Sequence, residues 1–192
     1  MGPKGKVRVV EPSRTEEAHA RRVASAKATV PELVLRSSIP GSVSLGQLVH
    51  ACARALREHP RLNASYRDGR FELHGRVNVA ASEDGLLAPT IFDADTKSAA
   101  EISRELDELR ARGRAGELAP TDVSGATFTV ATLAVPGFTA VLHPPQAAVL
   151  AVGVGGEGPT QIALTCDHRI LFGPEAAAFL ALVAELLRSE AT

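Results

Sequence analysis

The sequence has little cysteine, few aromatic residues and no long apolar run. Its 192 residues include two cysteines, one tyrosine and no tryptophan. Cys52 and Cys166 lie far apart and form no CxxC or Cys/His cluster, so a four-ligand zinc site is excluded and no metal is expected. We interpret both residues as free thiols in a reducing compartment.

A strong charge of one sign and a membrane-spanning stretch are also missing. Lysine and arginine number 21 against 22 acidic residues, a net charge of −1, which disfavours a nucleic-acid binder. No apolar run approaches the roughly 20 residues that cross a bilayer. The first six residues have no apolar stretch behind them, so no secretory signal is expected. We therefore expect a cytoplasmic protein with neither membrane nor nucleic-acid partners.

The residues that are present suit a globular domain. Hydrophobic residues make up 45% of the chain and charged residues 22%, near the averages for globular proteins. Residues 1–12 are expected to be disordered or extended, because they begin with a stretch rich in glycine, proline and lysine. Residues 13–192 are expected to form a single domain.

Helix signals recur along the chain. Ser44 with Gln47 forms a capping box ahead of an apolar pattern at helical spacing, and His59-Pro60 ends it. A second helix begins at Ser98, capped with Glu101, and a third opens at Gly173-Pro174. A weaker helix, with a mostly alanine apolar face, is plausible over residues 14–27.

Strand signals lie between these helices. Residues 127–133 alternate as a strand, and residues 147–154 and 161–166 form buried apolar runs. Asp84-Gly85 separates two shorter apolar runs and predicts a hairpin turn. About three long helices among about six strands indicate a two-layer α/β sandwich with a mixed sheet.

One local cluster has catalytic character. Asp167-His168-Arg169 stands between a buried strand and a helix start, where a histidine can serve as a general base. The alternative is a structural ion-pair network. A nucleophilic role for Cys166 is disfavoured, because Cys166 and His168 share a face only if the strand continues through both residues. His143, before Pro144-Pro145, is a candidate for lining a cleft.

The order of several short segments resembles the catalytic domain of the dihydrolipoyl acyltransferases of 2-oxo acid dehydrogenase complexes. The resemblance covers most of the chain and rests on the following segments: Thr29-Val30-Pro31, Leu62-Asn63-Ala64-Ser65, Asp84-Gly85-Leu86-Leu87-Ala88-Pro89, Asp93-Ala94-Asp95-Thr96-Lys97, Gly125-Ala126-Thr127-Phe128-Thr129, Pro144-Pro145-Gln146-Ala147 and Asp167-His168-Arg169.

This resemblance implies a fold, a chemistry and an assembly. The fold would be that of chloramphenicol acetyltransferase. His168 would deprotonate an acceptor that attacks a thioester of CoA or of a carrier protein, with no covalently bound cofactor. The implied assembly is a homotrimer with active sites at subunit interfaces. Asp167 and Arg169 would neighbour the base, and His143, Pro145 and Gln146 are candidates for the substrate channel.

Three positions depart from the family pattern. Ala131 and Thr132 stand where the family has Ser-Asn, and that serine hydroxyl is understood to bond the oxyanion. Phe172 stands where the family has Asp or Asn before the glycine. Thr129, two residues from Ala131 on the same strand face, is a candidate substitute donor.

The resulting expectation is a stand-alone acyltransferase without a lipoyl domain, acting on a small-molecule acceptor in specialised biosynthesis. Two alternatives stay open. The first is a non-catalytic binding or scaffold homologue. The second is an enzyme repurposed for cyclisation or elimination on the same fold.

Overall fold

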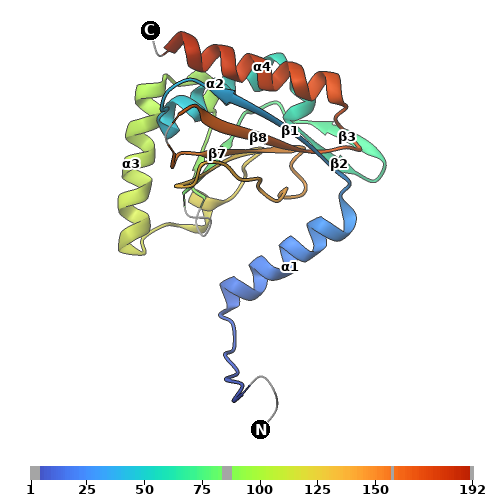
Figure 1. Cartoon of the computed structure of the whole chain (residues 1–192), viewed down its shortest axis with the longest axis vertical. Helices are drawn as coiled ribbons and strands as arrows, with labels where there is room; N and C mark the ends of the chain where they lie inside the picture. Colours follow the sequence, from blue (N-terminus) through green and yellow to red (C-terminus); the bar gives the residue numbers. More distant parts are fainter. Residues whose placement is uncertain (1–4, 84–87, 157, 191–192) are drawn as a thin grey trace.

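The computed structural model describes residues 5–83, 88–156 and 158–190. Residues 5–13 are exposed and form neither helix nor strand. Helix α1 (Arg14–Thr29) then projects away from the body of the molecule (Figure 1), and Ala26 is its one buried residue. The division into a segment 1–12 and a domain 13–192 stays a prediction.

A six-stranded mixed sheet forms the body, in the order β1-β8-β7-β6-β4-β5. Strand β6 runs parallel to both β4 and β7, whereas the other neighbours pair antiparallel. The strands are β1 (Glu32–Ile39), β4 (Val79–Glu83), β5 (Thr90–Ile91), β6 (Phe128–Leu133), β7 (Ala148–Gly153) and β8 (Thr160–Asp167). A separate hairpin consists of β2 (Ala64–Arg67) and β3 (Arg70–Leu73).

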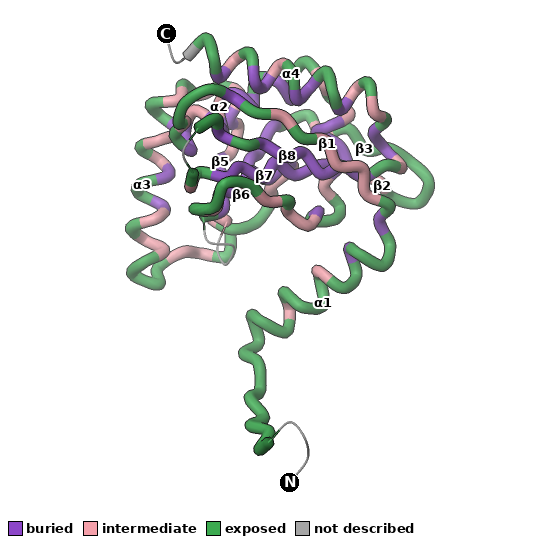
Figure 2. Tube along the Cα trace, in the orientation of Figure 1, coloured by how far each residue is buried: buried purple, intermediate pink, exposed green. Residues whose placement is uncertain are grey.

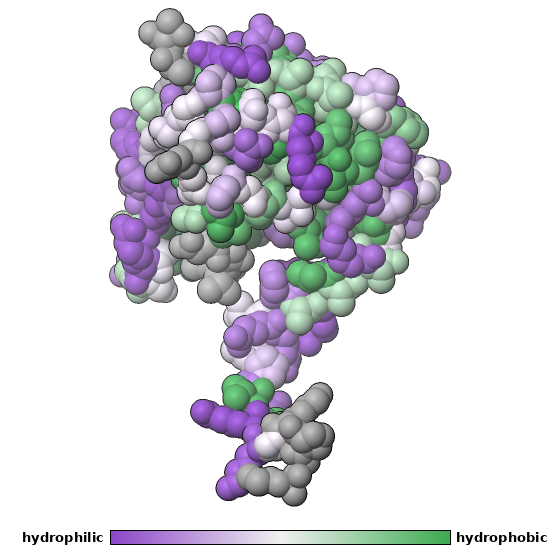
Figure 3. Space-filling view, in the orientation of Figure 1, coloured by the Kyte–Doolittle hydropathy of each residue, from purple (hydrophilic) through white to green (hydrophobic). Residues whose placement is uncertain are grey.

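Helices α2 (Leu45–Glu58), α3 (Ala99–Ala115) and α4 (Gly173–Glu190) form the second layer. Figure 2 shows buried positions concentrated in the central strands and on the inner sides of α2 and α4. Phe128 of β6 and Phe179 of α4 meet there, with ring centroids 5.8 Å apart. Figure 3 shows hydrophilic side chains along the outer side of α3. The predicted two-layer α/β architecture is confirmed.

The other face of the sheet carries no helix layer among the described residues. Side chains alternate along a strand, so Thr129 and Ala131 point to this face while Phe128 and Val130 join the main core. A small second core, made of Val30, Leu142 and Val149, lies here. This face therefore exposes part of β6 to whatever approaches the sheet.

The local signals agree closely with the structure. The capping boxes at Ser44–Gln47 and Ser98–Glu101 are both present, and strands β6, β7 and β8 match the predicted runs within two residues at each end. A third capping box, at Ser13–Glu16, begins α1. The described residues hold eight strands rather than about six, and the short β2–β3 hairpin accounts for the difference. The Asp84-Gly85 turn lies outside the described residues, although β4 and β5 do pair antiparallel.

Candidate active site

The loop from Asp167 to Phe172 joins β8 to α4 and presents His168. Its backbone is fixed on both sides: the Asp167 N–H donates to the Ala147 carbonyl and the His168 N–H to the Pro31 carbonyl, both at 2.8 Å. The N–H groups of Ile170 and Leu171 both donate to the Asp167 carbonyl at 3.0 Å. These four N–H bonds therefore hold the backbone on both sides of the histidine.

The His168 ring is exposed and oriented through one nitrogen. Its Nδ1 lies 2.8 Å from the carbonyl oxygen of Leu171. A carbonyl oxygen only accepts hydrogen bonds, so Nδ1 carries the proton in the neutral ring. The lone pair then lies on Nε2, which is the arrangement that a general base needs.

Asp167 and Arg169 form an ion pair beside the imidazole. The Asp167 carboxyl is 3% exposed and accepts from the Arg169 backbone N–H at 3.0 Å, from Nε at 2.9 Å and from Nη2 at 2.6 Å. These bonds raise the pKa of Arg169. The guanidinium lies 4.5 Å from the centre of the Tyr66 ring. The ion pair thus braces the loop against the β2–β3 hairpin.

Cys166 does not have the properties of a nucleophile. It is fully buried on the helix-facing side of β8. Burial, with smaller contributions from the negative charges of Asp167 and Glu175, raises the pKa of its thiol to about 12. The reactive form is the thiolate, so this cysteine stays protonated at neutral pH.

The three β6 candidates present no free hydroxyl to the open face. Thr129 is 1% exposed, and its hydroxyl donates to Gln146 Oε1 at 2.8 Å. Ala131 is half-buried and has no hydroxyl to offer. The Thr132 hydroxyl faces the opposite way and reaches the Ser82 carbonyl at 3.4 Å.

The channel candidates separate into two groups. Gln146 joins the β6 residues through Thr129, and its Nε2 donates to the Ala126 carbonyl at 3.2 Å. His143 lies instead near α1. Loss of surrounding water lowers the pKa of its ring, with added repulsion from Arg22 and His19. Pro145 is exposed beside Gln146.

Phe172 stands next to the base and leads to residues that sequence reasoning missed. Its side chain is 54% exposed, and its ring centroid lies 5.9 Å from that of His168. The Arg61 guanidinium lies 5.8 Å from the Phe172 ring centre and 4.9 Å from that of Phe71. No sequence signal links residues so far apart, because the fold alone brings them together.

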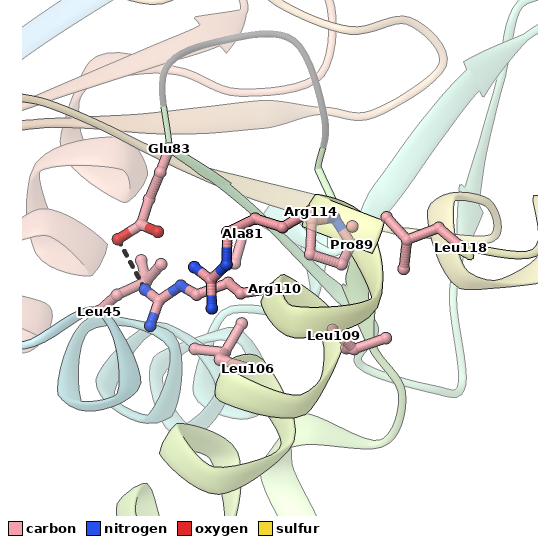
Figure 4. Close-up of a pocket in the computed structure, with 10 residues that line it drawn as sticks. Leu45, Ala81, Glu83, Pro89, Leu106, Leu109, Arg110, Arg114 and Leu118 are labelled. Carbon is pink, nitrogen blue, oxygen red and sulfur yellow. Dashed lines mark hydrogen bonds and ion pairs between the residues drawn. The ribbon is translucent and has the colours of Figure 1, made fainter. Parts of the chain in front are cut away.

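A hollow of about 300 Å³ lies away from the His168 cluster (Figure 4). Helix α3 lines it with both aliphatic and arginine side chains, and Arg110 of this helix pairs with Glu83 at 2.6 Å across its rim. The lining residues are Leu45, Ala81, Glu83, Pro89, Leu106, Leu109, Arg110, Gly113, Arg114 and Leu118. Neither the 167–172 loop nor β6 contributes to it. Within the described residues, no group of three or more His, Cys, Asp or Glu could hold a metal ion. No helix in that part of the chain is long and apolar enough to cross a membrane.

Comparison with known proteins assigns the chain to a family. The sequence profile of the 2-oxoacid dehydrogenases acyltransferase (catalytic domain) matches residues 13–192. Component 3 of the Arabidopsis thaliana mitochondrial pyruvate dehydrogenase complex, a dihydrolipoyllysine-residue acetyltransferase, is 33% identical over 88% of this chain and 39% of its own length. The chain thus spans well under half of that relative.

Solved structures agree on the fold. Dihydrolipoamide acetyltransferase from Azotobacter vinelandii has a TM-score of 0.87 at 24% identity, covering 96% of this chain and 92% of that one. A chloramphenicol acetyltransferase has a TM-score of 0.55 at 16% identity, covering 92% and 97%. The predicted chloramphenicol acetyltransferase-like fold is therefore confirmed, and the chain belongs to the family of 2-oxoacid dehydrogenase acyltransferase catalytic domains.

Proposed function

We propose that this chain is an acyltransferase in which His168 activates a small-molecule acceptor against a thioester of CoA or of a carrier protein. The observation that carries the proposal is the exposed imidazole whose Nδ1 is tied to the Leu171 carbonyl. This bond leaves Nε2 as the free base. The acyltransferase family of the chain supplies the reaction class.

The proposed step moves one proton and one acyl group. His168 Nε2 takes the proton from the acceptor thiol or hydroxyl as its sulfur or oxygen attacks the thioester carbonyl carbon. The tetrahedral intermediate collapses, the bond from carbon to the leaving sulfur breaks, and the imidazolium returns its proton to that sulfur. The catalyst is thereby regenerated without a bound cofactor or metal.

The oxyanion of this intermediate needs a hydrogen-bond donor, and β6 has no free side-chain hydroxyl on the open face. Ala131 lacks a hydroxyl, and the Thr129 proton is used by Gln146. Losing one such donor typically slows turnover by about 10²–10³-fold, which weakens a catalyst without abolishing it. Thr129 remains our candidate donor, provided that substrate displaces its bond to Gln146.

We also propose a homotrimer with shared active sites. His168 is exposed on the single chain, while Ala131 lies half-buried on the open sheet face. In the family arrangement, the base of one subunit faces β6 of its neighbour. An isolated subunit would then be inactive.

The acceptor is proposed to differ from that of the relatives. The study of the Azotobacter enzyme concerned a serine, a histidine and an asparagine, the last two being four residues apart. In this chain, Phe172 follows His168 at that spacing. An apolar ring in place of a polar side chain favours an acceptor with an apolar body, and we propose that this acceptor is a small molecule of specialised biosynthesis.

The test is transfer from acetyl-CoA to a panel of small thiols and alcohols, with products identified by mass spectrometry. His168→Ala should lower the rate by about 10²–10⁴-fold, the usual contribution of a general base. His19→Ala, an exposed histidine on α1, is the matched control and should retain the wild-type rate. Equal rates in wild type and His168→Ala would remove this residue from the mechanism.

A non-catalytic role is the second candidate, favoured by the missing hydroxyl at Ala131. Such a scaffold would have no reason to retain a CoA site. Calorimetric titration with CoA separates this scaffold from a CoA-dependent transferase, because absence of binding at millimolar ligand supports the scaffold and contradicts transfer from CoA.

A further inference from the structure

We propose that Phe172, Arg61 and Phe71 form a binding surface for the planar apolar body of the acyl acceptor. We call these three residues the aromatic wall. The inference rests on the proposed function, because the acceptor is defined there as the group that His168 deprotonates. It goes further by naming an aromatic acceptor and the residues that select it.

The wall begins in contact with the base. The Phe172 and His168 rings meet edge to face, with centroids 5.9 Å apart and planes inclined by 64°. Any acceptor whose thiol or hydroxyl reaches the imidazole therefore also comes within reach of Phe172. From there the Arg61 guanidinium bridges to Phe71, at 5.8 Å from one ring centre and 4.9 Å from the other.

Arg61 and Phe71 of the wall are held by the fold. Arg61 Nη2 donates to the Ile170 carbonyl at 2.7 Å, and Nη1 lies 3.8 Å from Glu175 at the start of α4. Phe71 is the cross-strand partner of Tyr66 in the β2–β3 hairpin, with ring centroids 6.1 Å apart. Figure 1 shows this hairpin beside the N-terminal end of α4. A pre-formed surface binds at a lower entropic cost than one that must be ordered.

The exposure of the wall identifies it as a contact surface. Phe172 is 54% exposed and Phe71 46% exposed, although both are large apolar side chains. Covering such rings is favourable at roughly 25 cal/mol per Å² of apolar area, and exposed apolar patches of this kind mark contact sites. The wall therefore stabilises a ligand that removes both rings from water.

The charge at the wall indicates a neutral ligand. Arg61 has Glu175 and the Ile170 carbonyl as partners, so its charge is offset in part, while its buried Nε has no hydrogen-bond partner among the described residues. Its guanidinium plane still stacks with aromatic faces. We therefore favour a neutral aromatic ring as the ligand, because the Glu175 carboxylate beside the guanidinium repels a carboxylate or a phosphate.

The experiment measures acceptor selectivity with acetyl-CoA as donor. Benzyl mercaptan and 2-mercaptoethanol are the two acceptors, and the kcat/KM ratio between them is measured after subtraction of the uncatalysed reaction. Each transfer forms one acceptor thioester and releases one CoA thiol. The wild type should favour benzyl mercaptan. Phe172→Asn should lower the ratio by about tenfold, as expected for losing roughly half the contact of a buried aromatic ring.

Val154→Asn is the matched control, because it exchanges another half-exposed apolar side chain at 50% exposure for the same amide. It should leave the ratio unchanged. An unchanged ratio in Phe172→Asn, with transfer still dependent on His168, would overturn the wall and leave the proposed function standing. The wall is also overturned if Phe172→Asn dissociates the oligomer without altering the ratio, since Phe172 would then be a subunit contact.

A binding measurement keeps the two proposals separable if the wild type transfers nothing. Benzyl alcohol is titrated into wild type, Phe172→Asn and His168→Ala while the ring signals of the phenylalanines are followed by NMR. The wall predicts shifts in wild type and in His168→Ala that are lost in Phe172→Asn. Equal shifts in wild type and Phe172→Asn, or no shifts in wild type, would overturn it.

Discussion

The loop 167–172 and strand β6 carry the two halves of the proposed chemistry and differ sharply in how completely they are built. In the loop, the backbone N–H groups from Asp167 to Leu171 all have acceptors, the Asp167 carboxylate is paired with Arg169, and one ring nitrogen of His168 is fixed by the Leu171 carbonyl. On β6, Ala131 carries no hydroxyl, and those of Thr129 and Thr132 bond within the chain.

This difference teaches which requirement the chain retains. Orienting a base needs a rigid loop, which the ion pair and the hairpin provide. Stabilising an oxyanion needs a donor aimed at the site. The Thr129 and Thr132 hydroxyls of β6 instead donate to Gln146 and to the Ser82 carbonyl. We infer a catalyst that retains an oriented general base, His168, and has weakened stabilisation of the oxyanion.

Removing the ion pair between Asp167 and Arg169 should have the largest effect on the protein. Asp167→Ala removes the carboxylate of a residue that is 3% exposed, and this carboxylate accepts four hydrogen bonds from Arg169. Because the Arg169 side chain is 32% exposed, we expect a loss of about 2–3 kcal/mol in the free energy of unfolding, below the range for fully buried pairs. Urea denaturation measures it. Asp167→Asn, which keeps the acceptor oxygen, should lose less, and an unaltered midpoint in Asp167→Ala would show that the pair does not brace the loop.

Restoring a hydroxyl on β6 should raise turnover, and this is the second-largest effect that we expect. Ala131→Ser places a donor at the half-buried position on the open face, and we expect turnover to rise about tenfold, a part of the usual value of an oxyanion donor. Ala151→Ser is the control, because Ala151 is the register partner of Ala131 on β7. Steady-state kinetics with acetyl-CoA measures both. A gain equal in the two variants, or none in Ala131→Ser, would contradict the assignment of β6.

Removing the Thr129 hydroxyl tests whether it is structural or catalytic. Thr129→Val leaves Gln146 Oε1 without its donor, at an expected cost of about 1 kcal/mol in unfolding free energy. Thr132→Val, whose bond to Ser82 is longer at 3.4 Å, should cost less. If Thr129 also serves the oxyanion, turnover falls in Thr129→Val beyond what stability explains, whereas an unchanged kcat removes it from the mechanism.

The smallest effect is expected at Cys166. Since burial raises the pKa of this thiol to about 12, the neutral form persists at neutral and mildly alkaline pH. The folded protein should therefore not react with a thiol-specific disulfide reagent under mildly alkaline conditions, and reaction should appear on denaturation. Rapid labelling of Cys166 in the native state, detected by peptide mass spectrometry, would contradict its placement in the core.

Local features of the fold could be predicted because the sequence signals them within a few residues. Ser44–Gln47 and Ser98–Glu101 cap helices through side chains three positions apart, and the alternation along β6 sets which residues share a face. The position of His168 at a strand end is equally local.

What the sequence could not predict depends on distant partners. The polar sequence context of His59 and His74 predicts solvated rings, yet His59 packs edge-on against Phe179 and His74 bonds to the Ser65 hydroxyl at 2.8 Å. Arg61 meets Ile170, 109 positions away, only after the sheet and hairpin form. The Thr129 bond to Gln146 likewise depends on how the turn before β7 packs.

The central claim is that the neutral His168 ring carries its proton on Nδ1 and offers Nε2 as the base. Nitrogen-15 NMR of histidine-labelled protein, assigned by comparison with His168→Ala, reads the tautomer directly. We predict that Nδ1 is protonated and Nε2 is not at a pH where the ring is neutral. A proton found on Nε2 would contradict the bond to the Leu171 carbonyl and with it the proposed base.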